Sequence, residues 1–204
     1  MELIISIFIF ALSSSITPGP NTVMIMASGL NHGIKNSLPH VFGICFGFPI
    51  MVILLGLGLG FIFEKYTFLH EIIKITGVLY LLFLAYKIST SAKASFKSKK
   101  SKAMTFVQAF IFQWLNPKAW VVAAGAISAY TNASSNIYSQ VFLIAFIFFL
   151  VAFPSVFIWL IFGSKLKKVL KNNKHHRIFN YTMGFLLFLS ILPIINELLI
   201  KYIL

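Results

Sequence analysis

Long apolar runs are the feature that most constrains how this chain can fold. A helix crosses the hydrocarbon of a bilayer in about 20 residues, and in lipid every backbone polar group has to be paired within the structure. Residues 141–150, VFLIAFIFFL, show no alternation of apolar and polar side chains, which argues against a membrane β-barrel. The runs predict six transmembrane helices, at Leu3–Leu30, Leu38–Phe63, Phe68–Ile88, Phe106–Ala129, Val141–Phe162 and Ile178–Ile200.

Composition favours an all-α integral membrane protein and excludes several kinds of site. Of the 204 residues, 59% are hydrophobic and 10% are charged, whereas soluble domains carry about 25% charged residues. The four acidic residues are all glutamates, so carboxylate-based enzymes and metal sites lack their usual groups. The single cysteine, Cys45, excludes an intramolecular disulfide, a redox pair and a four-thiolate zinc site. We therefore expect no enzyme activity, no metal site and no cofactor.

Basic residues are concentrated in alternate loops, and this distribution predicts an orientation. Thirteen of the 17 basic residues follow the first, third and fifth runs, and the positive-inside rule places such loops in the cytoplasm. Both termini are then outside. The first run is interpreted as a retained helix rather than a signal peptide, because Glu2 replaces the usual basic start and the run continues past Pro18. The net charge of +13 thus reflects topology and attraction to anionic lipids, and nucleic acid is not an expected partner.

Two proline motifs interrupt the first and fourth runs near their midpoints. Thr17 precedes Pro18, and Asn116 precedes Pro117. Each pair places a good N-cap residue before a proline at the first position of a new helix. Since a proline also displaces the carbonyl four residues before it, we expect both helices to be broken. Prolines also kink helices in membrane proteins that are not transporters, and a single proline motif is equally consistent with such a kink.

The two halves of the chain have matching patterns. Gly77 in the third run corresponds to Gly184 in the sixth, just as the two breaks correspond. Because each half holds three runs, the halves would be inverted copies, the architecture of many secondary transporters with a site at the repeat interface. We divide the single transmembrane domain into a first three-helix repeat at 1–90, a basic cytoplasmic linker at 91–103 and a second three-helix repeat at 104–204.

Several motifs resemble the signature of the LysE-type (RhtB-type) amino-acid exporters of bacteria. They are TPGPN at 17–21, GLNHG at 29–33, the glycine-bounded segment 43–47, GVLYL at 77–81 and NPK at 116–118. The resemblance covers nearly the whole chain. It implies proton-driven export of an amino acid or a close derivative across the bacterial cytoplasmic membrane. Thiol-redox and metal-exporting branches of the wider superfamily are not matched, since a cysteine pair and an acid-rich histidine loop are absent.

The two breaks supply a candidate substrate site. A helix N-terminus presents free N–H groups that suit a carboxylate, and a helix C-terminus presents carbonyls that suit an ammonium group. Lys118 lies near the middle of the fourth run, where a charge is costly and usually functional. It either acts on the substrate or holds the kink by reaching a carbonyl, and the neighbouring polar residues either bind substrate or cap the half-helices. The predicted substrate-binding residues are Thr17, Pro18, Gly19, Pro20, Asn21, Gln113, Asn116, Pro117 and Lys118.

The expected partners are a small amino-acid substrate and the lipid bilayer, with a homodimer left open. Three alternatives remain at this point: an exporter of a metal or another inorganic ion on the same fold, a membrane enzyme, and a structural subunit without transport activity. An enzyme would need a nucleophile–base pair or a carboxylate cluster in the membrane, and the sequence offers only scattered serine, histidine and lysine residues. A transport assay with amino acids and metals would distinguish an ion exporter from an amino-acid exporter. A structural subunit would tolerate mutation of the two helix breaks.

Overall fold

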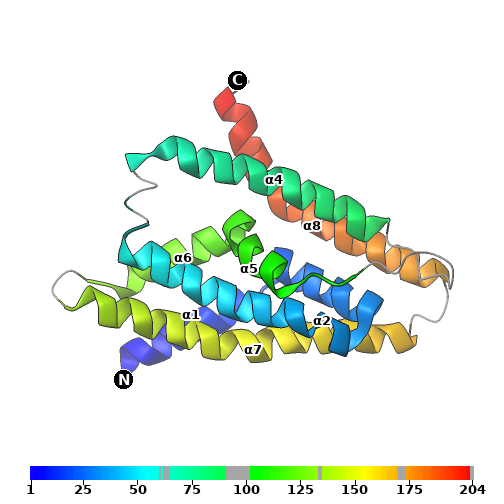
Figure 1. Ribbon diagram of the computed structural model, residues 1–204, viewed down its shortest axis with the longest axis horizontal. Helices are drawn as coiled ribbons and strands as arrows, with labels where there is room; N and C mark the ends of the chain where they lie inside the picture. The colour runs from blue at the N-terminus through cyan, green and yellow to red at the C-terminus, as the bar shows by residue number, and fades with distance from the viewer. Residues whose placement is uncertain (60, 62–64, 91–101, 133–134, 170–172, 203–204) are drawn as a thin grey trace.

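A computed structural model describes the chain except residues 60, 62–64, 91–101, 133–134, 170–172 and 203–204. The predicted linker at 91–103 therefore lies outside the described residues, apart from its last two positions. The described ranges consist of helices joined by short connections, with no strand among them (Figure 1). The helices are α1 (Glu2–Ile16), α2 (Pro20–Leu54), the short π-helix η1 (Leu55–Leu59), α4 (Thr67–Ser89), α5 (Phe106–Leu115), α6 (Pro117–Tyr130), α7 (Ile137–Val169) and α8 (Asn173–Tyr202).

Four stretches of the described helices have the length and composition of membrane-spanning segments. Two further helices, α1 and α5, are apolar but shorter. Large apolar side chains such as Leu79, Phe146 and Phe185 are exposed on the outside of the bundle, as a lipid-facing surface requires. The chain is therefore an all-α, multi-pass membrane protein. The four stretches that are long enough to cross a bilayer on their own are Pro20–Gly58, Glu71–Ser89, Ile137–Leu166 and Arg177–Lys201.

Both predicted helix breaks are present. Helix α1 ends at Ile16 and α2 begins at Pro20, with Thr17 in a non-helical conformation at ψ 131°. Helix α5 ends at Leu115 and α6 begins at Pro117, with Asn116 extended at φ −91° and ψ 106°. The first and fourth predicted spans are thus each divided into two shorter helices.

Helix α2 reverses direction at Gly33. This residue has φ +78°, a left-handed conformation that glycine adopts without strain. The hydroxyls of Ser28 and Ser37 lie 2.8 Å apart. In a straight helix nine residues would separate them by about 13 Å. The chain therefore forms a helical hairpin here, and the boundary predicted between the first and second spans falls at this turn.

Helices from the two halves of the chain pack against each other. Helix α2 packs chiefly against α7 and α5, and α4 packs chiefly against α8, as Figure 1 shows for α4 and α8. Two glycines allow the backbones of α2 and α7 to approach closely, since Gly29 faces the carbonyl of Leu160 and Gly163 faces the carbonyl of Met26. Each of the three buried apolar clusters combines residues from both halves, so the two halves are packed together in the interior.

Candidate functional site

A cavity lies where the two helix breaks meet. It encloses about 600 Å³, including space open to the surface, and its walls come from α1, the break after it, α2, α6 and α7. Two residues that are distant in the sequence, Gly19 and Lys118, lie on its wall in direct contact. The cavity is lined by five of the predicted site residues, Thr17, Gly19, Asn21, Asn116 and Lys118.

Lys118 joins the two breaks. Its ammonium Nζ donates a hydrogen bond of 2.6 Å to the backbone carbonyl of Thr17, which lies in the first break. Its backbone N–H donates to Oδ1 of Asn116 at 3.2 Å, so Asn116 caps α6 as the sequence predicts. A Cβ on Gly19 would lie 2.8 Å from Cδ of Lys118, and glycine is therefore the residue that leaves room for this side chain. The ammonium lies on the cavity wall while it holds the kink, so both roles considered for it are sterically compatible.

The start of α2 corrects one expectation. Thr17 was expected to cap a helix beginning at Pro18, and that was wrong, because α2 begins at Pro20 and its N-cap is Gly19. The hydroxyl of Thr17 instead donates to the carbonyl of Ser13 at the end of α1. Gly19 has no side chain to act as a cap, but the hydroxyl of Thr22 accepts from the backbone N–H of Gly19 at 2.7 Å, as the third helical residue does in a capping box. The second of the two prolines therefore occupies the favoured first helical position.

Asn21 and Gln113 form a polar link between α2 and α5. Nδ2 of Asn21 donates to Oε1 of Gln113 at 2.8 Å, and Nε2 of Gln113 donates back to Oδ1 of Asn21 at 3.3 Å. Gln113 is fully buried, and its Nε2 also donates to the carbonyl of Ala109. Asn21 lines the cavity, whereas Gln113 lies behind it and holds Asn21 in place.

Four predicted site residues lie beside the cavity and not on its wall. Pro18, Pro20 and Gln113 shape the breaks, and Pro117 lines a neighbouring cavity of about 610 Å³ between α4, α6 and α8. The reasoning from sequence missed most of the wall. Several lining residues within α2 and within α7 are spaced four apart, as residues on one face of a helix are. In an apolar run every face looks alike, so the sequence does not show which face lines the cavity. The missed lining residues are Ser14, Ser15, Thr22, Ile25, Ile44, Phe48, Ala119, Val122, Ala152 and Val156.

The charge and chemistry of the cavity favour a small solute with a negative group. Lys118 is the charged residue among those that line it, and the described lining contains no carboxylate. The described residues contain no group of three or more histidine, cysteine or acidic side chains able to hold a metal ion. Hydroxyl and amide groups such as those of Ser14 and Asn21 supply further hydrogen bonds beside apolar walls.

Comparison with known proteins identifies the family to which this chain belongs. The family model for LysE type translocators matches residues 12–191, which include both breaks and every residue that lines the central cavity. The chain belongs to this family. LysE-type proteins are transporters and not enzymes.

Individual relatives carry more specific names. An uncharacterized membrane protein YrhP of Bacillus subtilis (strain 168) is 27% identical over 190 residues, covering 84% of this chain and 88% of that protein. A homoserine/homoserine lactone efflux protein of Salmonella typhimurium is 29% identical over 114 residues, covering 54% of this chain and 55% of the relative. A cysteine/O-acetylserine efflux protein of Salmonella choleraesuis is 29% identical over 123 residues, covering 59% of this chain and 62% of the relative. These two matches span little more than half of the efflux proteins. No solved structure matches the chain.

Proposed function

We propose that this LysE-type translocator exports an amino acid or a close derivative across the bacterial cytoplasmic membrane, driven by the proton gradient. The cavity at the two breaks is the substrate site, and the protein works by alternating access. The observation that carries the proposal is the contact between Lys118 and the carbonyl of Thr17, which puts an ammonium group and an opened helix end on one cavity wall. The names of the two efflux relatives support the substrate class.

The two ends of a zwitterion match the groups that meet at Lys118. A substrate carboxylate competes with the carbonyl of Thr17 for the ammonium of Lys118, and it also faces the N-terminus of α6, which favours an anion. The carbonyl released by this exchange then accepts a hydrogen bond from the substrate ammonium. Asn21 and Asn116 add polar contacts, and the apolar walls contributed by residues such as Val156 favour a short side chain without a positive charge.

Helix lengths support six crossings arranged as two inverted repeats. At 1.5 Å per residue, α1, α5 and α6 extend about 22, 15 and 21 Å, each less than the roughly 30 Å of hydrocarbon. Each broken pair, α1 with the start of α2 and α5 with α6, then makes one crossing. The pairing of α2 with α7 and of α4 with α8 joins helices at equivalent positions in the repeats 1–90 and 104–204, an arrangement compatible with a two-fold axis in the membrane plane.

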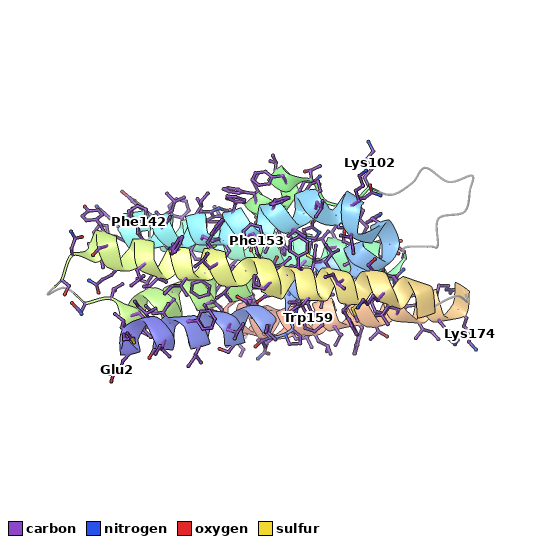
Figure 2. The ribbon with its side chains drawn as sticks, turned by 90° about the horizontal axis from the view of Figure 1, so that it is seen from below. Glu2, Lys102, Phe142, Phe153, Trp159 and Lys174 are labelled. Atoms are coloured by element: carbon purple, nitrogen blue, oxygen red, sulfur yellow. The ribbon has the colours of Figure 1, made fainter. Side chains whose placement is uncertain are left out.

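The charge distribution supports the orientation. Figure 2 shows Lys102 and Lys174 at one end of the long axis and Glu2 at the other. Lys35, at the reversal within α2, belongs to the same set of basic loops. Under the positive-inside rule the basic end faces the cytoplasm, and both termini face outside.

Export assays in cells test the proposal. Cells that express the protein would be fed dipeptides, and the amino acids that accumulate in the medium would be measured with and without an uncoupler. In cells carrying Lys118→Ala we expect export to fall at least about tenfold, because the substrate carboxylate would lose the ammonium group that binds it. Loss of one partner of a buried, hydrogen-bonded charge pair costs about 2–5 kcal/mol. Lys35→Ala removes an exposed lysine away from the cavity and should export normally. Unchanged export by Lys118→Ala at equal membrane abundance would exclude the proposed site, and export that survives the uncoupler would exclude proton coupling.

A further inference from the structure

A second polar cavity lies at the basic end of the protein. It has a volume of about 520 Å³, including space open to the surface, and lies between the hairpin of α2, the end of α4 and the segment that leads into α5. None of the residues predicted from the two breaks lines it, so the proposed substrate site leaves it unexplained. Its polar lining consists of Ser28, Asn31, His32, His40, Lys87 and Lys102.

His40 is the unusual residue of this cavity. It is 1% exposed, yet neither of its ring nitrogens has a hydrogen-bond partner within the described structure. Buried polar groups are normally paired, and an unpaired group calls for a specific explanation. Since His40 lines the cavity, a molecule bound there would lie beside its imidazole ring. A neutral imidazole donates at one nitrogen and accepts at the other, and so it can engage a carboxylate together with a hydroxyl or ammonium group.

The surrounding charges select an anion. Lys87 of α4 and Lys102 line the same cavity, and its described lining contains no acidic residue. A cavity with charges of one sign raises the local concentration of small ions of the opposite sign and the rate at which they bind. Because the basic end faces the cytoplasm in the proposed orientation, such ions would arrive from inside the cell.

The two cavities share one helix segment. Thr22 lines the central cavity and Ser28 lines the second one, six residues later on the first arm of α2. At the rise of an α-helix this separation is about 9 Å. The apolar cluster that contributes Ile25 and Ile44 to the central cavity also contains Val41, the neighbour of His40 in the sequence. A solute at His40 therefore lies about two helical turns from the central site.

We propose that this second cavity is an entry site that binds a small carboxylate-bearing solute from the cytoplasm, with His40 positioning it and Lys87 and Lys102 attracting it. The inference rests on the proposed function for the identity of the solute as the exported amino acid, but binding of a carboxylate at His40 can be measured without transport.

Affinity labelling with bromoacetate tests the site in membranes that contain the full chain. An imidazole nitrogen attacks the methylene carbon, the carbon–bromine bond breaks, bromide leaves, and the second nitrogen loses a proton. The product is a carboxymethyl histidine that peptide mass spectrometry locates. Iodoacetamide is the uncharged comparison, and exposed His175 is the internal reference for reactivity in solution. We expect the ratio of bromoacetate to iodoacetamide labelling to be at least about tenfold higher at His40 than at His175, since a focused field raises binding rates 10-fold or more.

Three further measurements sharpen the test. Excess glycine, the simplest zwitterion, should protect His40 and leave His175 unaffected. Lys87→Ala combined with Lys102→Ala should lower the selectivity at His40, whereas Lys35→Ala is the matched control and should preserve it. Failure to label His40, or an equal ratio at both histidines, would overturn the entry site. In the Lys118→Ala variant, labelling of His40 should persist. Loss of export with intact labelling would show that the two sites are distinct. Normal export by the Lys118→Ala variant would refute the central site and leave the entry site standing.

Discussion

Replacing Gly163 by alanine should force α2 and α7 apart. An added Cβ would lie 2.1 Å from the backbone carbonyl oxygen of Met26, where ordinary contact begins at 3.4 Å. Because the obstacle is backbone, no side-chain rotation relieves it, and the contact has to lengthen by 1.3 Å, from 2.1 to 3.4 Å. Inserting a methyl group into a packed interior costs about 1–3 kcal/mol, and the backbone contact places Gly163→Ala at the upper end of that range.

Gly29 makes the reciprocal contact on the other helix. A Cβ there would lie 2.4 Å from the carbonyl oxygen of Leu160. The same separation of α2 and α7 relieves both clashes, so the double variant should cost clearly less than the sum of the two single variants. Export should fall too, because Ile25 on α2 and Val156 on α7 both line the central cavity, which moves with the two helices.

Reversible unfolding of the purified protein in mixed micelles gives the free energies. Gly125→Ala is the matched control, since the nearest atom to its added Cβ is 3.9 Å away. This control should be neutral or gain up to about 1 kcal/mol from the higher helix propensity of alanine. If Gly163→Ala proves as stable as Gly125→Ala, or if the double variant is strictly additive, the reasoning on close packing is refuted.

Three further predictions concern stability, and the same unfolding measurement checks each. The double-mutant cycle of Asn21→Leu and Gln113→Leu should show a coupling of about 1 kcal/mol, in the range measured for interhelical hydrogen bonds in membranes, and a coupling near zero would contradict the paired geometry. Thr105→Ala should destabilise by about 1 kcal/mol because its hydroxyl caps α5, whereas Thr105→Ser should keep wild-type stability. Lys74→Ala should cost less than about 1 kcal/mol, and added salt should reduce this loss further, because its partner Glu197 is 60% exposed and the pair is screened; a loss that is larger or independent of salt would contradict this.

Features set by local chemistry were predictable from the sequence. The helical class follows from the apolar runs, and the breaks at Thr17 and Asn116 follow from prolines that cannot continue a helix ladder. The exact restart of α2 was not predictable in the same way. Either Pro18 or Pro20 could take the first helical position, and in the structure it is Pro20, with the hydroxyl of Thr22 bonded to Gly19 just before it.

Features set by long-range packing were not predictable. Ala152 and Val156 line the cavity, but they sit in a run whose every face is apolar, since lipid and protein interior favour the same side chains. The link between Asn21 and Gln113 joins positions 92 residues apart, and no local pattern pairs them. The imidazole of His40 is likewise marked only by its unpaired burial, which depends on tertiary structure.

The pairing of helices across the two halves of the chain bears on how the protein is made. Helix α2 is inserted before its main neighbour α7 exists, and synthesis from Leu54 to Val169 takes on the order of ten seconds at bacterial elongation rates. During that interval Gly29 lacks the α7 backbone that it packs against, and Asn21 lacks its partner Gln113 until α5 has been made, so both must be shielded by the insertion machinery or by lipid. Nascent chains halted before α7 emerges should therefore be prime targets for membrane quality-control proteases, and co-expressing the missing half should rescue them.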